Sequence, residues 1–308
     1  MADLGTGRRR PAVDVLRAPV GTTVSRVTQS GEHLLVLSCP DRPGIVHAVS
    51  SFLVMTGCNI LDSQQYRDPD TDRFFLRVHV AADAAVTPEQ LRAAFEATAG
   101  SFAMDWHLDA VAPMRTLIMV SRQDHCLQDL LFRHRTGSLP VALTAVVSNH
   151  PDARSLVEWH GVPFHHVPSQ DKPAAEAHLS ELIASTRTEL VVLARYMQVL
   201  SAELCARLEG RAINIHHSFL PSFTGARPYA QAHDRGVKLI GASAHYVTAD
   251  LVEGPIIEQD DARADHTATV EQLARVGQEI EARVLARAVL WHAERRVLRN
   301  GTRTVVFR

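Results

Sequence analysis

The sequence predicts an α/β protein of two domains, a small domain followed by a larger one built on a mostly parallel sheet. In the first third of the chain, apolar runs and helical patterns follow the order β-α-β-β-α-β. From Thr116 onward, short apolar runs alternate with longer amphipathic segments, which is typical of a parallel sheet with helices on both faces. The 308 residues are enough to bury two hydrophobic cores.

The domain boundaries follow from changes in this pattern. Residues 1–30 have no sustained periodicity and are expected to form a flexible arm. We assign the small domain to residues 31–110 and the larger domain to residues 115–308.

The small domain opens with the apolar run LLVLSC, a predicted strand, followed by a helical stretch that ends at Gly57. We expect Asp41 to cap this helix and Pro43 to lie in its first turn. The stretch TPEQ has the form of a capping box with proline at the first helical position, so a second helix should follow Thr87. The predicted strands cover residues 34–39, 59–66, 74–80 and 102–108, which together give the ferredoxin-like plan.

The larger domain is predicted to alternate strands and helices up to a closing helix. Its strands are expected at residues 116–121, 141–148, 163–167, 190–194, 212–217, 239–247 and 255–260. Its shorter helices are expected at residues 125–134, 153–160, 174–186, 201–208 and 228–236. A long helix is predicted from about Thr269 to Leu298, because Leu273, Val276 and Ile280 recur at helical spacing.

Composition excludes several classes of protein. The formal net charge is only −2, and the one basic cluster, Arg8 to Arg10, lies in the expected arm, so we predict no nucleic-acid surface. No apolar run approaches twenty residues, which predicts no membrane span and a cytoplasmic protein. The cysteines lack ligand-like spacing and read as reduced thiols; they are Cys39, Cys58, Cys126 and Cys205.

The strand in INIHHSFLPSFTGARPY has one polar face. Side chains alternate along a strand, so Asn214 and His216 share a face opposite Ile213 and Ile215. At the carboxyl end of a parallel strand this pair could form an oxyanion hole, worth about 3 kcal/mol per donor. A satisfied core pair would give the same pattern. The following loop could cover the site, with Thr224 and Gly225 as lid residues.

Longer motifs favour the catalytic interpretation. INIHHSFLPSFTGARPY, then GVKLIGASAHYVTADLVEGPIIEQD and the pair Asp265-His266, closely resemble the folate-dependent formyltransferase fold. More narrowly, CPDRPGIV, then HCLQDLL and SNHPD, then LARYMQVLS resemble the formyltetrahydrofolate deformylase family. The resemblance spans nearly all of residues 33–308. It implies a ferredoxin-like ACT domain followed by a Rossmann-like formyltransferase domain.

The resemblance also implies an activity and a set of site residues. The family hydrolyses 10-formyltetrahydrofolate to formate and tetrahydrofolate without a metal, in one-carbon metabolism and purine biosynthesis. Asn214 and His216 would polarise the formyl group. A reduced folate would be held, largely by main chain, at Met197, Gln198, Val199, Leu200, Thr248, Ala249, Asp250 and Leu251.

This sequence departs from the family pattern at two positions. The family reads V-T-x-x-L-D-x-G-P in the pterin loop, and its catalytic Asp falls at Val252 here. The arginine of Y-M-R-V-L is replaced by Gln198. Since loss of a general base costs on the order of 10²–10⁴ in rate, hydrolysis is expected to be impaired or rerouted. The glycine loop that holds phosphate in related glycinamide ribonucleotide enzymes is replaced by SRQDHC, which favours water as the acceptor.

Several features stay open at this stage. The histidines His125, His217, His245 and His266 lack metal-binding spacing, so no metal is expected. Asp41 to Gly44 resembles the ACT effector turn, which could bind an amino acid or pair subunits. ACT-like domains commonly pair edge to edge, so we expect a homo-oligomer, either a dimer or a tetramer. Two alternatives to a hydrolase are a formyltransferase of specialised metabolism and a non-catalytic folate-binding regulator.

Overall fold

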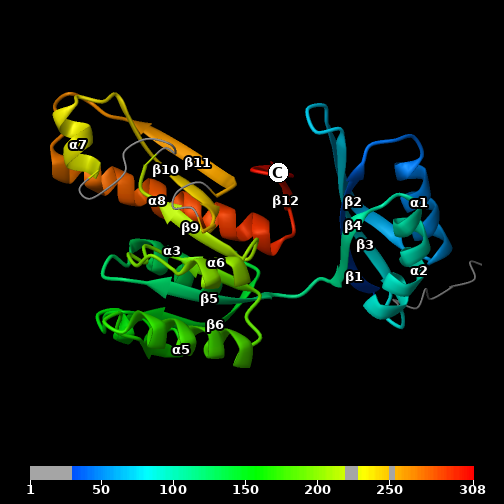
Figure 1. The fold of residues 1–308 in the computed structure, drawn as a ribbon, viewed down its shortest axis with the longest axis horizontal. Helices are drawn as coiled ribbons and strands as arrows, with labels where there is room; N and C mark the ends of the chain where they lie inside the picture. The colour runs from blue at the N-terminus through cyan, green and yellow to red at the C-terminus, as the bar shows by residue number, and fades with distance from the viewer. Residues whose placement is uncertain (1–29, 219–227, 250–253) are drawn as a thin grey trace, which may run out of the picture.

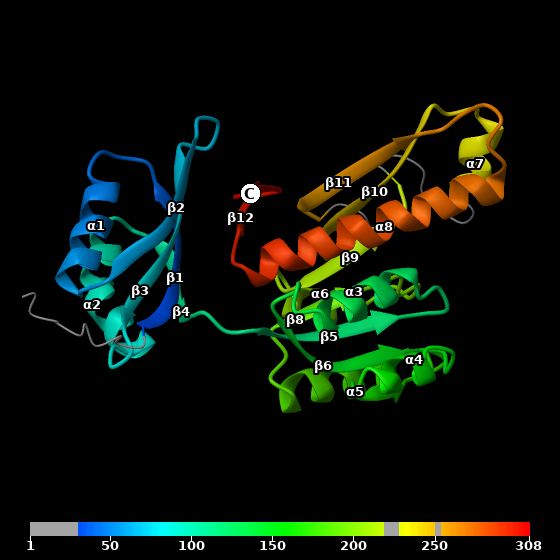
Figure 2. The same cartoon turned by 180° about the vertical axis from the view of Figure 1, so that it is seen from behind.

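The computed structural model describes residues 30–218, 228–249 and 254–308, which form two domains joined by a short connection (Figures 1 and 2). The small domain contains β1 (Ser30–Pro40), α1 (Ile45–Met55), β2 (Asn59–Asp68), β3 (Arg73–Asp83), α2 (Pro88–Ser101) and β4 (Asp105–Ala110). Its antiparallel sheet has the order β2-β3-β1-β4. Both helices cover one face of this sheet, so the predicted ferredoxin-like plan is confirmed.

Two local predictions in the small domain were wrong. The helix α1 begins at Ile45 behind Gly44, which adopts φ 99°, and no side chain caps it. Asp41 instead accepts a hydrogen bond from Arg67 of β2, at 2.6 Å, so it connects the segment before α1 to that strand. The last strand begins at Asp105 rather than Phe102, because Phe102 is the C-cap of α2. The capping box at Thr87 is present as predicted.

The larger domain is a seven-stranded sheet covered on both faces. Its strands are β5 (Met114–Val120), β6 (Val141–Ser148), β7 (Phe164–His166), β8 (Leu190–Leu193), β9 (Ala212–His216), β10 (Leu239–Tyr246) and β11 (Ile256–Arg263). Its helices are α3 (His125–Arg135), α4 (Arg154–Trp159), α5 (Lys172–Ser185), α6 (Ala202–Arg207), α7 (Pro228–Asp234) and α8 (Val270–Ala293). The strand order is β11-β10-β9-β8-β5-β6-β7; the five strands from β7 to β9 are parallel, and β10 pairs antiparallel with both of its neighbours, β9 and β11.

Alternation along the strands divides the apolar side chains between two cores. Leu117 and Met119 of β5 face the helices α5 and α6. Ile118 and Val120 face α3, α4 and α8 on the other side. A parallel strand with both faces buried reads as a continuous apolar run, which is why TLIMV was recognisable in the sequence.

The end of the chain differs from the prediction of one long helix. The helix α8 stops at Ala293, and Arg295 adopts φ 55°, which turns the chain away. A hairpin follows, made of β12 (Val297–Asn300) and β13 (Arg303–Val306). Its two-residue loop is Gly301-Thr302, and glycine with a positive φ, here 60°, at the first loop position is typical of a type II′ hairpin turn.

This hairpin ties the two domains together. Leu298 and Phe307 pack on Phe75, a fully buried side chain of β3. Asn300 donates a hydrogen bond to the buried carboxylate of Asp68. The ribbon views agree that β12 lies between the two domains (Figures 1 and 2). The C-terminal residues therefore pack against the sheet of the small domain and connect it to the larger domain.

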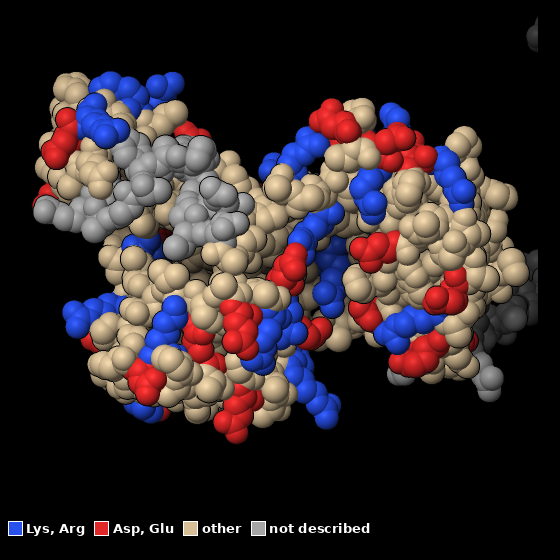
Figure 3. All heavy atoms as spheres, in the orientation of Figure 1, with Lys and Arg blue, Asp and Glu red and all other residues tan. Residues whose placement is uncertain are grey.

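Acidic and basic side chains are interspersed over the face drawn in Figure 3, and neither sign forms a continuous area on it. Among the described residues, the helices include none that is long and apolar enough to cross a membrane.

Candidate active site

The polar face predicted for β9 lines a cavity. Ile213 and Ile215 are buried in the core, whereas Asn214 and His216 face a pocket of about 390 Å³. The pocket lies at the carboxyl ends of β8 and β9, where an open α/β sheet gathers its reactive groups.

The pocket brings together eight of the residues that the sequence singled out. They are Met197, Gln198, Val199, Leu200, Asn214, His216, Thr248 and Ala249. Its other lining residues are Leu193, Arg195, Tyr196, Cys205, Ile215, His217, His245 and Val247. One wall is therefore apolar and another carries the amide and the imidazoles, which suits a flat ligand with a polar reacting group.

A buried histidine orients Asn214. His245 Nδ1 lies 2.9 Å from the Tyr246 carbonyl oxygen, and a carbonyl only accepts, so Nδ1 carries the hydrogen. The Nε2 atom of the same ring must then accept, and it lies 3.2 Å from Asn214 Nδ2. One N–H of the Asn214 amide is thereby occupied, while its second N–H and its oxygen have no partner among the described residues and are available to a ligand in the pocket.

His216 is held neutral. Its ring stacks on His217 at 4.8 Å between centroids and 24° between planes. Burial, followed by the neighbouring His217, His245 and Arg195, lowers the pKa of His216 to about 4. Its Nε2 atom is buried and has no hydrogen-bond partner among the residues that the structure describes. An imidazole in this state can offer a polar atom to a ligand without carrying charge at neutral pH.

A second group of buried polar residues behind the pocket was not predicted. Glu281 of α8 is buried and is approached by Arg195, Tyr229 and His125. Its sequence signal was a carboxylate beside Ile280 on the buried face of an amphipathic helix, where an acidic residue needs partners. The contact between His125 and Glu281 joins α3 to α8 across 156 positions, so no local pattern could show it.

The remaining predicted site residues fall elsewhere. Thr224, Gly225, Asp250, Leu251 and Val252 lie outside the described residues. The turn from Asp41 to Gly44 belongs to the small domain and does not line this pocket.

Comparison with known proteins identifies both domains. The sequence model of the family described as Formyl transferase matches residues 114–289, and that of the ACT domain matches residues 33–95. The formyltetrahydrofolate deformylase of Corynebacterium sp. (strain P-1) is 53% identical over 286 residues, which is 92% of this chain and 100% of that protein. The chain belongs to the formyltetrahydrofolate deformylase family. The namesake from Bacillus subtilis (strain 168) is 48% identical over 278 residues, covering 89% of this chain and 93% of that one.

Solved structures of deformylases have the same two-domain fold. A formyltetrahydrofolate deformylase from Pseudomonas syringae pv. tomato str. DC3000 superposes with a TM-score of 0.88 at 44% identity, over 92% of this chain and 96% of that one. Glycinamide ribonucleotide transformylase 1 from Symbiobacterium toebii gives a TM-score of 0.60 at 32% identity, over 64% of this chain and 95% of that one. The predicted fold class, an ACT domain followed by a Rossmann-like formyltransferase domain, is confirmed.

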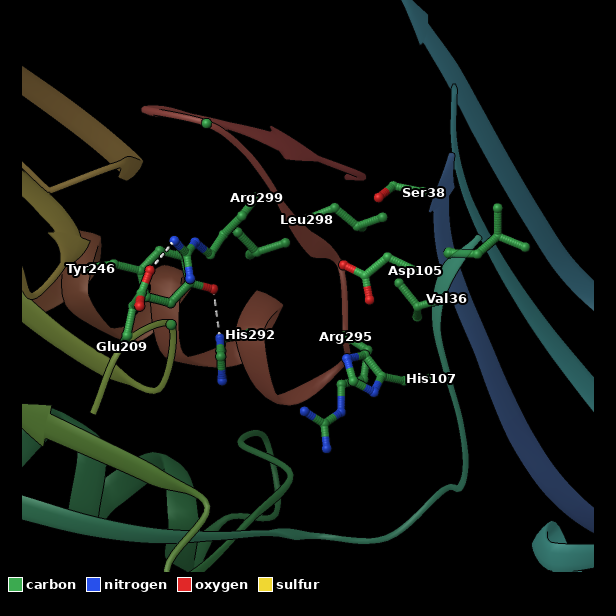
Figure 4. A pocket seen from close by; sticks show the side chains of 14 residues that line it. Val36, Ser38, Asp105, His107, Glu209, Tyr246, His292, Arg295, Leu298 and Arg299 are labelled. Atoms are coloured by element: carbon green, nitrogen blue, oxygen red, sulfur yellow. Dashed lines mark hydrogen bonds and ion pairs between the residues drawn. The ribbon is translucent and has the colours of Figure 1, made fainter. Parts of the chain in front are cut away.

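A second cavity, of about 550 Å³, lies between the ACT domain and the deformylase domain (Figure 4). Asp105 and His107 reach it from the ACT sheet, and Arg295 reaches it from the segment that follows α8. Tyr246 forms part of its wall, and its hydroxyl shares a hydrogen bond with His292 Nδ1 at 2.7 Å. Strand β10 therefore separates this cleft from the pocket that holds Asn214.

Proposed function

We propose that this protein hydrolyses 10-formyltetrahydrofolate to formate and tetrahydrofolate, with Asn214 and His216 as its catalytic residues. The observation that carries the proposal is the pairing of a half-buried amide and a half-buried neutral imidazole on the wall of an otherwise largely apolar pocket. The relatives named as deformylases, which match over nearly the whole chain, support the same reaction.

The pair would act on the formyl oxygen. The free N–H of Asn214 and a neutral N–H of His216 can both donate to this oxygen as a water attacks the carbon and negative charge develops. Breakdown of the tetrahedral intermediate releases formate, and the departing folate nitrogen takes a proton. A histidine with a pKa of about 4 is a good neutral donor and a weak base.

The proton of the attacking water therefore needs another acceptor. The family supplies an aspartate there, and Val252 stands at that position in this chain. We expect hydrolysis to be slow for this reason.

The folate would occupy the apolar part of the pocket. Met197 and Val199 are exposed, at 59% and 54%, although both are apolar, which supports their contact with a flat ring system. The backbone from Met197 to Leu200 and at Thr248 and Ala249 would supply hydrogen bonds to the pterin, and Asp250 and Leu251 would continue that wall.

The ACT domain would provide an amino-acid site and a contact between subunits. The helix α1 ends in Val54 and Met55, which are 77% and 85% exposed, and such side chains favour an interface with a second copy. Deletion of residues 1–110 should then abolish the dimer or tetramer in sedimentation. All four cysteines are free, which supports a cytoplasmic location.

The direct test is formate release from 10-formyltetrahydrofolate with no acceptor present. Wild-type protein should release formate, His216→Ala should not, and Asn214→Asp should be nearly as damaging because it replaces a donor by an anion. Full turnover by His216→Ala with an unchanged fold would refute the proposed roles.

Val252 specifically favours a second candidate, a formyltransferase whose amine acceptor carries its own base. Tetrahydrofolate formation that requires an added amine and yields no formate would select this candidate. Tight folate binding without turnover in any mixture would instead indicate a regulator.

A further inference from the structure

A buried ion pair lies directly behind the proposed catalytic histidine. The Glu281 side chain is only 1% exposed and the Arg195 side chain 9%, and Arg195 Nε lies 3.3 Å from Glu281 Oε2. The same carboxylate accepts from the Tyr229 hydroxyl at 2.6 Å and contacts His125 Nε2 at 2.9 Å. Both carboxylate oxygens are therefore engaged, as a buried charge requires.

The guanidinium of Arg195 is fixed in a second way by Gln123. Its Nε and one terminal nitrogen donate to Gln123 Oε1 at 3.1 and 2.8 Å. The backbone of Arg195 adopts φ 63°, an uncommon conformation for a residue with a side chain, directly after β8. Such an outlier typically costs about 1–3 kcal/mol and persists only where surrounding contacts hold it. Here the contacts include those of the guanidinium and the hydrogen bond that Ser121 N–H donates to the Arg195 carbonyl oxygen.

The remaining nitrogen of Arg195 determines the state of His217. It lies 2.8 Å from His217 Nδ1, and because a guanidinium can only donate, Nδ1 accepts. The His217 ring is therefore neutral, with its hydrogen on Nε2. This neutral ring is the one on which His216 stacks, at 4.8 Å between centroids.

We propose that Arg195 is a positioning residue: held by Glu281 and Gln123, it fixes His217 as one neutral tautomer and so keeps the stacked His216 neutral and in place. The inference rests on the proposed function, since His216 contacts the formyl group there. Glu281 acts as the counter-charge that limits the effect of Arg195 on the two imidazoles.

A metal site is the competing interpretation of this region. Ligand atoms of His125, Cys126 and Glu281 lie within 4.8 Å of one another. However, the guanidinium 3.3 Å from Glu281 would repel a cation, and burial together with Glu281 raises the pKa of the Cys126 thiol. The cluster therefore fits an internal ion pair.

Two charged residues near His216 should shift its pKa in opposite directions when they are replaced. The groups that face it are His217 on the same strand, His245 from β10, Arg195 from the end of β8 and Glu281 from α8. Arg195 lowers the pKa of His216 and Glu281 raises it. Arg195→Met should therefore raise the pKa of His216, and Glu281→Gln should lower it.

The test is an NMR titration of His216, assigned by the loss of its signal in His216→Ala, in wild type and both variants. Opposite shifts in the two variants are expected, and Arg195→Lys should stay near wild type because it retains the charge. Equal shifts, or none in folded variants, would overturn the proposal. The NMR titration does not depend on catalysis. If the wild-type protein releases no formate, that result refutes the proposed function but leaves the role of Arg195 to be decided by the titration.

Steady-state kinetics supply a second readout. Arg195→Met should lower kcat about ten- to a hundred-fold while changing KM for the folate much less, since misplacing a reacting group by about 1 Å can cost a hundred-fold. Gln123→Ala removes the hydrogen bonds that Arg195 donates to Gln123 without removing a charge. It can be measured instead of Arg195→Met if Arg195→Met fails to fold. Gln123→Ala should lower kcat less than Arg195→Met does. An unchanged kcat for folded Gln123→Ala would indicate that the hydrogen bonds from Arg195 to Gln123 do not position His217.

Discussion

Gly277 and Tyr229 fit each other across two helices. A Cβ atom built on Gly277 of α8 would lie 2.0 Å from the Tyr229 hydroxyl oxygen, an impossible contact. Because position 277 carries no side chain, the hydroxyl passes over the helix and donates to Glu281 at 2.6 Å. Burial, Glu281 and the hydrogen bond to it raise the pKa of Tyr229, so the phenol stays protonated and able to donate.

Gly277→Ala should therefore destabilise the protein, although alanine is normally favoured over glycine within a helix by about 1 kcal/mol. Displacing the half-buried Tyr229 ring should cost about 1–3 kcal/mol. Urea unfolding measures the loss. In a Tyr229→Ala background the same change should become neutral or stabilising, and a loss that persists there would contradict the steric explanation.

His245→Ala should release the Asn214 amide from its fixed orientation. We expect kcat to fall about ten- to a hundred-fold. Removing an oxyanion donor itself lowers kcat about 10²–10³-fold, so the loss here should be no larger than that. The measurement is formate release at saturating folate. An activity equal to wild type would show that the hydrogen bond between Asn214 and His245 is dispensable.

Val252→Asp should restore the carboxylate that the family pattern carries at this position. With a base available for water, formate release near pH 7 should rise at least about ten-fold, within the usual range for a general base. Val252→Asn is the matched control, since it adds a polar side chain without a base. No gain from the aspartate would indicate that another carboxylate, such as Asp250 or Glu253, already serves.

Stability should fall as the pH drops below about 6.5, the usual pKa of histidine. Burial lowers the pKa of His216 to about 4 and that of His292 to about 3, so the folded state resists protonation where the unfolded state accepts it. The stabilisation is therefore complete well above pH 6.5 and is lost progressively as the pH falls to about 4 for His216 and about 3 for His292. Urea unfolding at pH 7, 6 and 5 should show the decline. His292→Gln should reduce its slope, and an equal slope in that variant would contradict the assignment.

Deleting residues 297–308 should uncouple the two domains, because it removes the side chains that cover Phe75. Calorimetry should then resolve two transitions in place of one. Arg303→Ala is the control, since its ion pairs to Asp68 and Asp70 involve a side chain that is 55% exposed and should contribute about 0–1 kcal/mol. A single thermal transition at the wild-type temperature in the deleted protein would mean that other contacts couple the two domains.

Periodicity and local signals were sufficient to predict most of the fold. The apolar runs of the parallel sheet and the capping box at Thr87 appear as the sequence indicated, because their determinants are local. The helix start at Gly44 and the final hairpin were missed. In both places a tertiary contact, the Asp41 pairing with Arg67 and the packing of Leu298 on Phe75, overrides the local pattern.

The site was predictable only where it lies on one strand. Asn214 and His216 could be found because alternation puts them on one face of β9. Arg195, Tyr229 and Glu281 come from three separate elements, and only the fold brings them together. A lone acidic residue on the apolar face of α8 signals that a partner exists but cannot identify it.

The C-terminal hairpin also affects the order in which the chain can fold during synthesis. Asn300 and its partner Asp68 are separated by 232 positions, so the ACT domain leaves the ribosome long before the residues that cover its sheet. At about 5–20 residues per second the delay is roughly 10–50 s. Throughout this interval the apolar surface around Phe75 stays open to water, to chaperones and to neighbouring nascent chains.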